Sequence, residues 1–228
     1  MTNAYDYFVK FKGLTWNKPR FMREDKPIML PLESELDALI SHTGTKMSTF
    51  LQLLKETGVD SGEAWKLRWV DIDTERSLVS ITPTKNHSSR MLPVSSNLLA
   101  RLLRLQRKND RVFGNIDLDD FRAGYGRVRR HLALKLNNPR INQIAFKSFR
   151  HFRGTMLYHQ TKDILYCKWF LGHKRIENTM IYIHLVNFEK DEFICKVATT
   201  LEEAKALIEA NFEYVTDMGC HKLFRKRK

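Results

Sequence analysis

A tyrosine and a histidine near residue 180 have a spacing that suits phosphate chemistry. Tyr182 follows the segment Leu171-Gly172-His173 by nine residues. A phenol hydroxyl is a poor nucleophile near neutral pH unless cations or a base assist it. A tyrosine that only packs in a core needs no more than a hydrogen-bond partner for its hydroxyl. Considered alone, Tyr182 fits either a nucleophile or a core residue.

The segment KSFRHFR, residues 147–153, could supply the cations. In a helix, Lys147, Arg150 and His151 share one face because they are spaced i, i+3 and i+4. These groups repel one another unless they face an anion, and an arginine fork fits two phosphate oxygens. The pattern therefore favours an anion-binding face, although a basic turn that faces only water would look the same.

Two earlier positions are further candidates. Lys85 lies in a polar turn between two predicted strands, where a lysine can reach into a groove or simply remain solvated. Asp60 lies at the predicted start of a short helix, where side chains and amides can meet a phosphate. The run Asp60-Ser-Gly-Glu63 also fits a helix N-cap with its capping-box partner.

Hydrophobic periodicity predicts the elements that would position these residues. Helices are expected near residues 30–40, 45–57, 61–69, 95–103, 119–132, 148–160, 162–171 and 176–184. Gly58 should end the second helix, Ser95 or Ser96 should cap the fourth, and Asp119 or Asp120 should start the fifth. Alternating apolar and polar residues predict three short strands, at residues 70–73, 79–82 and 90–95, which form an antiparallel sheet.

The two ends of the chain differ from this middle part. Residues 1–27 are polar and basic and are expected to form an N-terminal arm or the remnant of a linker. Residues 187–228 predict a strand–helix–strand–strand extension, with a capping box at Thr200–Glu203. The predicted fold class is α+β, mainly α: a helical domain at residues 28–186 with a three-stranded antiparallel sheet, and a small C-terminal α+β extension.

Charge indicates the class of partner. The 228 residues include 39 basic and 26 acidic side chains, a net charge of +13 with histidine neutral, and residues 101–153 hold 14 basic against 4 acidic residues. Such a basic block favours a nucleic-acid partner, although a solvated face is the alternative. No apolar run approaches 18 residues, so no membrane span is expected. The scattered cysteines and histidines predict neither a disulfide framework nor a metal site.

In chain order, these motifs resemble the catalytic domain of the tyrosine recombinases, the phage integrase family. The family pattern has a TG-x-R-x-x-E-A/L-x-x-L-x-W-x-D-I-D block, a hairpin lysine, an H-x-x-R-H helix, an LGH, and a tyrosine about nine residues later. The matching segments here are Thr57–Asp73, Lys85, Lys147–His151, Leu171–His173 and Tyr182. The likeness covers about residues 28–186, and the KSFRH form and the tail resemble archaeal members.

The resemblance implies a site-specific DNA recombinase or integrase, encoded by a mobile element, that works through a 3′-phosphotyrosyl intermediate. It implies that Tyr182 is the nucleophile, that Lys85 is the general acid, and that Arg150 stabilises the transition-state charge. His173 would orient the phosphate, and Lys147, where the family most often has histidine, would assist proton removal or add charge.

The resemblance also implies the partners and the surroundings of such a site. Double-stranded DNA is the expected partner, with self-assembly into a tetramer on DNA, no cofactor, no metal, and a cytoplasmic, nucleoid-associated location. The side chains expected to bind DNA are Arg153, His151, Arg129, Arg130 and Arg90.

This sequence departs from the family pattern at two places. Asp60 stands where the family has its first catalytic arginine, and a carboxylate there would repel the scissile phosphate. Losing such a donor costs roughly 2.7–4 kcal/mol of transition-state stabilisation. Asp60 could instead pair with Arg150 or Arg68, and Arg68, Arg90 or Arg153 could replace the cation.

The second departure is that about 27 residues precede the first predicted helix, where the family usually carries a helical core-binding domain. A truncated or split gene and a minimal recombinase are both consistent with this. Three rivals to a recombinase stay open: a catalytically impaired DNA-binding remnant, a topoisomerase-like relaxing enzyme, and an RNA-binding protein.

Overall fold

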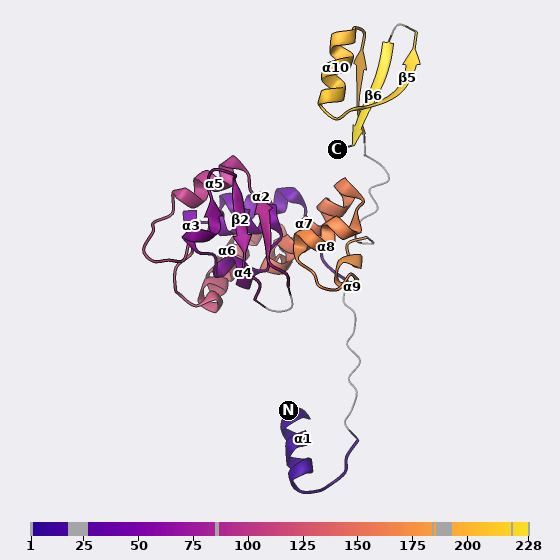
Figure 1. Cartoon of the computed structure of the whole chain (residues 1–228). Coiled ribbons are helices and arrows are strands. Elements are labelled where there is room, and N and C mark those ends of the chain that lie inside the picture. Colours follow the sequence, from indigo (N-terminus) through magenta and orange to yellow (C-terminus); the bar gives the residue numbers. More distant parts are fainter. Residues whose placement is uncertain are drawn as a thin grey trace.

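The computed structural model describes residues 2–17, 27–84, 87–183, 185, 193–219 and 221–227 (Figure 1). These residues are mainly helical, with small antiparallel sheets. The α-helices are α1 (Thr2–Phe11), α2 (Glu33–Ser41), α3 (Thr45–Thr57), α4 (Ser61–Trp65), α5 (Ser96–Leu103), α6 (Leu118–Lys135), α7 (Phe146–Thr161), α8 (Ile164–Leu171), α9 (Glu177–Met180) and α10 (Leu201–Glu209). The strands are β1 (Ile72–Asp73), β2 (Leu78–Ile81), β3 (Arg90–Pro93), β4 (Phe193–Ala198), β5 (Glu213–Met218) and β6 (His221–Arg227).

Helix α3 forms the centre of the larger hydrophobic core. It packs against α7, α2 and α5, and its residues Phe50, Leu51, Leu53 and Leu54 are fully buried. The Phe50 ring makes edge-on contacts with four other aromatic rings, at centroid distances of 5.1–5.7 Å: Trp65, Phe113, Phe121 and Phe146. Because such pairs add to the burial of apolar area, they fix α3 relative to α4, α6 and α7.

The predicted three-stranded sheet is present, with strand order β1-β2-β3 and both pairs antiparallel. Val79 pairs with Leu92, and both side chains are fully buried in the core. The prediction was wrong at Val70, which lies in a 3-10 turn at Trp69–Asp71 and is 82% exposed. The turn forms because the Arg68 backbone N–H donates to the Asp71 carboxylate, which favours a cap over an extended strand.

Helix ends follow local capping chemistry, with some differences from prediction. Gly58 ends α3 in the left-handed conformation (φ 60°), and Ser95 caps α5 by accepting from the Leu98 N–H, as predicted. Helix α6 begins earlier than predicted, because the Asp117 side chain caps it by accepting from the Asp119 N–H. Helix α4 ends at Trp65 and α9 at Met180, so both are shorter than the sequence predicted.

The C-terminal strands β4, β5 and β6 form a separate sheet with strand order β4-β6-β5, and α10 contacts β4. Thr200 and Glu203 form the predicted capping box at the start of α10. A small apolar cluster of Ala198, Ala204 and Phe224 joins helix and sheet. The strand–helix–strand–strand order of this part therefore agrees with the prediction.

Residues 2–17 contain helix α1, which the sequence analysis did not predict. The Trp16 indole donates to Asp6 at 3.0 Å and meets the Tyr5 ring edge-on. In the described part of the chain, no helix has both the length and the apolar character needed to cross a membrane.

Candidate active site

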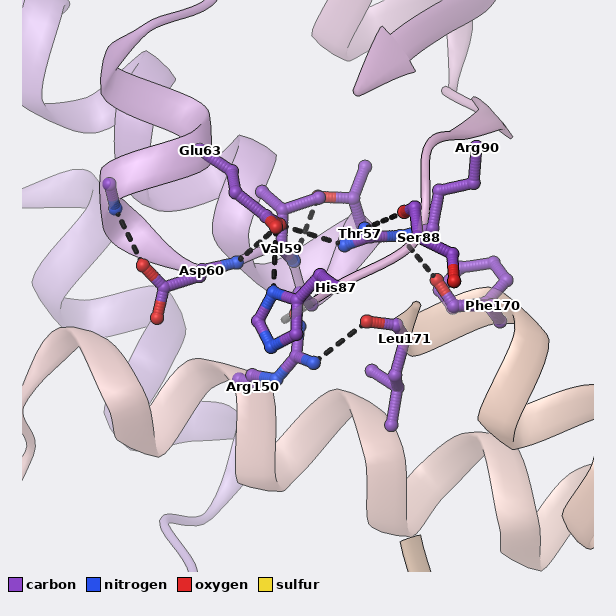
Figure 2. Close-up of polar contacts among 12 residues, drawn as sticks. Thr57, Val59, Asp60, Glu63, His87, Ser88, Arg90, Arg150, Phe170 and Leu171 are labelled. Atoms are coloured by element: carbon purple, nitrogen blue, oxygen red, sulfur yellow. Dashed lines mark hydrogen bonds and ion pairs between the residues drawn. The ribbon is translucent and has the colours of Figure 1, made fainter. Parts of the chain in front are cut away.

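Arg150 lies at the point where α3, α7 and α8 meet. It is on α7 and is 6% exposed, and its two terminal nitrogens donate to the backbone carbonyls of Gly58 and Leu171, each at 2.7 Å (Figure 2). Gly58 follows α3, and Leu171 is the last residue of α8. Two carbonyls at fixed helix ends therefore set the plane of the guanidinium before any anion arrives.

His173 follows α8 through Gly172, which adopts the left-handed conformation (φ 73°) that ends the helix. A side chain at Gly172 would also collide with the guanidinium of Arg90. Both the left-handed backbone and this close approach therefore favour glycine at residue 172. The His173 Nδ1 atom lies 2.9 Å from the Thr179 hydroxyl, in the segment that leads to Tyr182. This contact fixes the orientation of the imidazole.

Tyr182 packs beside these groups and is 2% exposed. Its ring is parallel to that of His173, with centroids 6.3 Å apart, and lies 5.9 Å from the ring of His151. Burial raises the pKa of the Tyr182 hydroxyl, while the charge of Arg150 and a hydrogen bond from it act in the opposite direction. Tyr182 is therefore a protonated phenol in this state, placed beside a cation that would favour its phenolate.

The two histidines of the site are neutral at pH 7. Burial lowers the pKa of His173 to about 3, helped by the charges of Arg150, His87 and Arg90. Burial also lowers the pKa of His151 to about 4, with smaller contributions from Lys147 and Arg150. A neutral imidazole can accept a proton, but these low pKa values mean that an anion beside the ring, such as a phosphate, is needed to favour the imidazolium.

Asp60 is the N-cap of α4, as the sequence predicted. Its carboxylate accepts from the Gly62 N–H at 2.9 Å, and Glu63 closes the capping box by accepting from the Asp60 N–H at 3.4 Å. Among the described residues, no ion pair joins Asp60 to Arg68 or Arg150. Arg68 pairs instead with Asp71 at 3.2 Å. Both proposed ion pairs of Asp60 are thus absent from this part of the chain.

Glu63 is the centre of a buried polar network that the sequence analysis missed (Figure 2). Its carboxylate accepts from Arg90 at 3.0 Å and from His87 Nδ1 at 2.6 Å, and its side chain is fully buried. Arg90 also donates to the carbonyls of Phe170 and Ser88. A buried arginine with three acceptors holds β3 against α4 and α8, so Arg90 positions these elements in the structure. The Glu63 capping signal and the His87 position near Lys85 were the available clues.

The other predicted residues differ in exposure. Lys147 is exposed at the start of α7, whereas the Arg153 guanidinium lies over the Phe170 ring at 5.0 Å. Both Arg129 and Arg130 lie on α6. Arg129 donates to the Ile144 carbonyl, and Arg130 donates to the Gly126 carbonyl of its own helix.

Lys85, the predicted general acid, lies outside the described residues. The described ranges contain no group of three or more histidine, cysteine or carboxylate side chains placed to hold a metal ion.

A buried tyrosine, a helix-borne arginine and the histidine of an LGH turn thus lie together on a mainly helical scaffold. The chain belongs to the phage integrase family, whose family model matches residues 32–188.

The relatives agree with this assignment. A probable integrase/recombinase protein of Methanocaldococcus jannaschii is 29% identical over 170 residues, which cover 69% of this chain and 51% of that protein. The tyrosine recombinase XerC of Xanthomonas campestris pv. campestris is 28% identical over 174 residues, covering 73% of this chain and 52% of XerC. The chain therefore spans about half the length of the curated relatives it matches.

Solved structures show the same fold. The XerA recombinase matches with a TM-score of 0.59 at 20% identity, over 93% of this chain and 75% of that one. The integrase of the Tn1549 transposon, solved in complex with transposon right end DNA, matches with a TM-score of 0.65 at 15% identity, over 90% of this chain and 75% of that one. At these identities the likeness concerns the fold alone.

Proposed function

We propose that this protein is a site-specific DNA recombinase that breaks and rejoins DNA through a covalent tyrosine intermediate. The observation that carries the proposal is the convergence of Tyr182, Arg150 and His173 at one buried point, in a chain of the phage integrase family. DNA-bound relatives of the same fold support double-stranded DNA as the partner. A relative has also been solved as a tetramer on a Holliday junction, which supports self-assembly on DNA.

In the proposed reaction, the Tyr182 oxygen attacks a backbone phosphorus and forms a phosphotyrosyl bond to the 3′ end. The bond between phosphorus and the 5′ oxygen breaks, and that oxygen takes a proton and leaves as a 5′-hydroxyl. Lys85 would give the proton, as the family resemblance implies, and a neutral histidine beside Tyr182 would receive the phenolic one. Arg150 would stabilise the added charge on the phosphate oxygens.

The covalent bond conserves the energy of the phosphodiester, so the reverse attack by a 5′-hydroxyl rejoins the strand. The same steps on a second duplex would give strand exchange. The buried state of Tyr182 supports an assembly-dependent reaction, because a 2% exposed phenol needs a local rearrangement to meet a DNA phosphate.

Asp60 supports a second candidate, a DNA-binding protein of this fold with impaired cleavage. A carboxylate occupies the position of the family's first catalytic arginine. Burial lowers the pKa of Arg150, and the charge of Asp60 is one of the smaller influences that act in the opposite direction, so the two groups interact electrostatically. The negative charge of Asp60 near the arginine that would bind the phosphate weakens the attraction of the site for an anion.

The test compares three proteins on supercoiled plasmid DNA at low salt: the unchanged sequence, Tyr182→Phe and Asp60→Arg. Plasmid relaxation and protein that stays attached to DNA after denaturation are both scored. The proposal expects relaxation and adduct from the unchanged protein and neither from Tyr182→Phe. Adduct from Asp60→Arg alone would support the impaired binding protein. Binding without adduct in all three proteins would contradict the cleavage function.

A further inference from the structure

Two residues between β2 and β3, Thr84 and His87, lie on the N-terminal end of α4. On one side of residues 85–86, the Thr84 hydroxyl lies 3.8 Å from the position of a Cβ at Gly62. On the other side, His87 Nδ1 lies 2.6 Å from the Glu63 carboxylate. Thr84 and His87 therefore both lie against α4, the helix whose N-cap is Asp60. His87 therefore contacts α4 at Glu63, three residues after Asp60, the position at which the family pattern has its first arginine.

His87 also contacts the segment of His173. The two residues form an antiparallel bridge, the Ser88 N–H donates to the Gly172 carbonyl at 3.0 Å, and the two rings lie 6.1 Å apart. The charges of His87 and Arg150 both lower the pKa of His173, so both groups lie close to its ring. In the view of Figure 2, the His87 ring lies between Glu63 and Arg150.

The bond to Glu63 determines what His87 can offer. An imidazole nitrogen 2.6 Å from a carboxylate oxygen acts as the donor, which assigns a proton to Nδ1. An anion that approaches Nε2 meets a donor only in the imidazolium form, in which both ring nitrogens carry a proton. The side chain is 23% exposed, whereas those of Glu63 and Arg90 are at most 1% exposed. Of these three groups, His87 alone keeps a surface through which it could reach an anion.

We propose that His87 binds the DNA phosphate beside Arg150 and supplies the positive charge that Asp60 does not. Glu63 orients the ring through Nδ1, and Nε2–H faces the phosphate oxygens. Arg90 does not have this role, because Glu63 neutralises it and the carbonyls of Phe170 and Ser88 engage its other donors. The inference rests on the recombinase function proposed above and adds a phosphate-binding residue to that site.

The first test measures the rate of adduct formation on plasmid DNA. His87→Gln keeps a neutral donor for Glu63 but removes the charge, so the rate should fall at least tenfold while the melting temperature stays close to that of the unchanged protein. His87→Arg should retain most of the rate. The matched control is His131→Ala, an exposed histidine on α6, which should leave the rate unchanged.

A double-mutant cycle asks whether His87 and position 60 supply the same charge. In the Asp60→Arg protein an arginine should already meet the phosphate, so adding His87→Gln should lower the rate by less than threefold. If His87→Gln lowers the rate by the same factor in both backgrounds, His87 and an arginine at position 60 do not supply the same charge, and this part of the inference is overturned. A wild-type rate in His87→Gln would overturn the whole inference and leave the recombinase function intact.

A second measurement does not depend on cleavage. In Tyr182→Phe protein, the histidine ring C–H signals are followed by NMR during titration with inorganic phosphate, and the His87 signal is identified by its loss in His87→Gln. A saturable shift of this signal is expected, and an unchanged signal would overturn the inference. If no protein forms an adduct but the His87 signal shifts, the proposed function fails while the phosphate contact stands.

Discussion

The ring of Tyr182 lies directly on the backbone of α7 at Gly154. A Cβ added at Gly154 would come within 2.8 Å of both Cε2 and Cζ of that ring, closer than carbon atoms normally approach. Gly154 is one helical turn after Arg150, so the same helix provides the cation and the surface on which the Tyr182 ring packs. The absence of a side chain at residue 154 is what allows Tyr182 to lie beside Arg150.

Gly154→Ala should therefore displace Tyr182. Adduct formation should fall about 100-fold, since small misplacements of reacting groups have effects of this size. The free energy of unfolding should fall by about 1–2 kcal/mol, because overpacking outweighs the higher helix propensity of alanine. Urea unfolding and the plasmid assay measure the two effects.

Two comparisons separate the ring contact from helix propensity. Gly126→Ala, on α6 with nothing within 4 Å of the new methyl group, should stabilise the protein by about 0.5–1 kcal/mol. Introduced into Tyr182→Ala protein, Gly154→Ala should also be stabilising, because the ring is gone. A destabilising effect in that background would show that the contact with Tyr182 is not the cause.

The pair Glu63–Arg90 should be important for stability because both side chains are buried. Arg90→Met leaves the Glu63 carboxylate without its main partner and should cost about 3–5 kcal/mol. Adding Glu63→Leu to that variant should recover part of the loss, since the buried carboxylate is then removed together with its arginine partner.

The exposed pair Arg68–Asp71 is the matched control for this buried pair. Arg68→Met should cost less than about 1 kcal/mol, because solvent screens an exposed pair. Equal losses for Arg68→Met and Arg90→Met in urea unfolding would contradict the importance of burial.

Asp60→Asn separates the capping role of the Asp60 side chain from its negative charge. Asparagine caps helices as well as aspartate does, so stability should stay within about 0.5 kcal/mol, whereas Asp60→Ala should cost about 1 kcal/mol. Removing the negative charge near Arg150 should also raise the rate of adduct formation several-fold.

Asp163 provides the control, since it caps α8 through the N–H groups of Leu165 and Tyr166. Asp163→Asn preserves a cap and changes the same charge at the opposite end of α8 from His173. It should leave the rate of adduct formation unchanged. An equal rise in both variants would point to a general effect of net charge on DNA binding.

The parts of the fold that local sequence determines were predicted well. Gly58, Ser95 and Thr200 act through their own backbone or side-chain geometry, so their roles as helix ends and caps could be read from the chain. Val70 was predicted wrongly because its alternation with Ile72 resembles a strand, while the Asp71 cap that decides the conformation is a competing local interaction.

The candidate site was predictable only in part. The Asp60 cap followed from the spacing of Asp60 and Glu63, and the resemblance assembled Tyr182, Arg150 and His173 into one set. The network of Glu63 with His87 and Arg90 joins residues up to 27 positions apart. No local pattern encodes such contacts, because they depend on how the hairpin folds back onto α4. The contact between the Tyr182 ring and Gly154 was not predicted either, because it too depends on how separate segments pack together.

Stability should depend on pH through His151 and His173. Their pKa values in the fold, about 4 and about 3, lie below the value of about 6.5 expected in an unfolded chain. Between pH 6.5 and pH 4 the unfolded chain therefore binds more protons than the folded one, so the free energy of unfolding falls as the pH falls. From pH 7 to pH 5 the loss should be about 1 kcal/mol for each histidine, which allows for partial solvent screening.

Urea unfolding at pH 7 and at pH 5 measures this loss. The double variant His151→Gln/His173→Gln should lose about 2 kcal/mol less than the unchanged protein between these two pH values, because it lacks both titrating groups. His131→Gln, which removes an exposed histidine of α6, should keep the full pH difference. If the double variant and the unchanged protein lose the same stability, the two site histidines are not held in the neutral form by the fold.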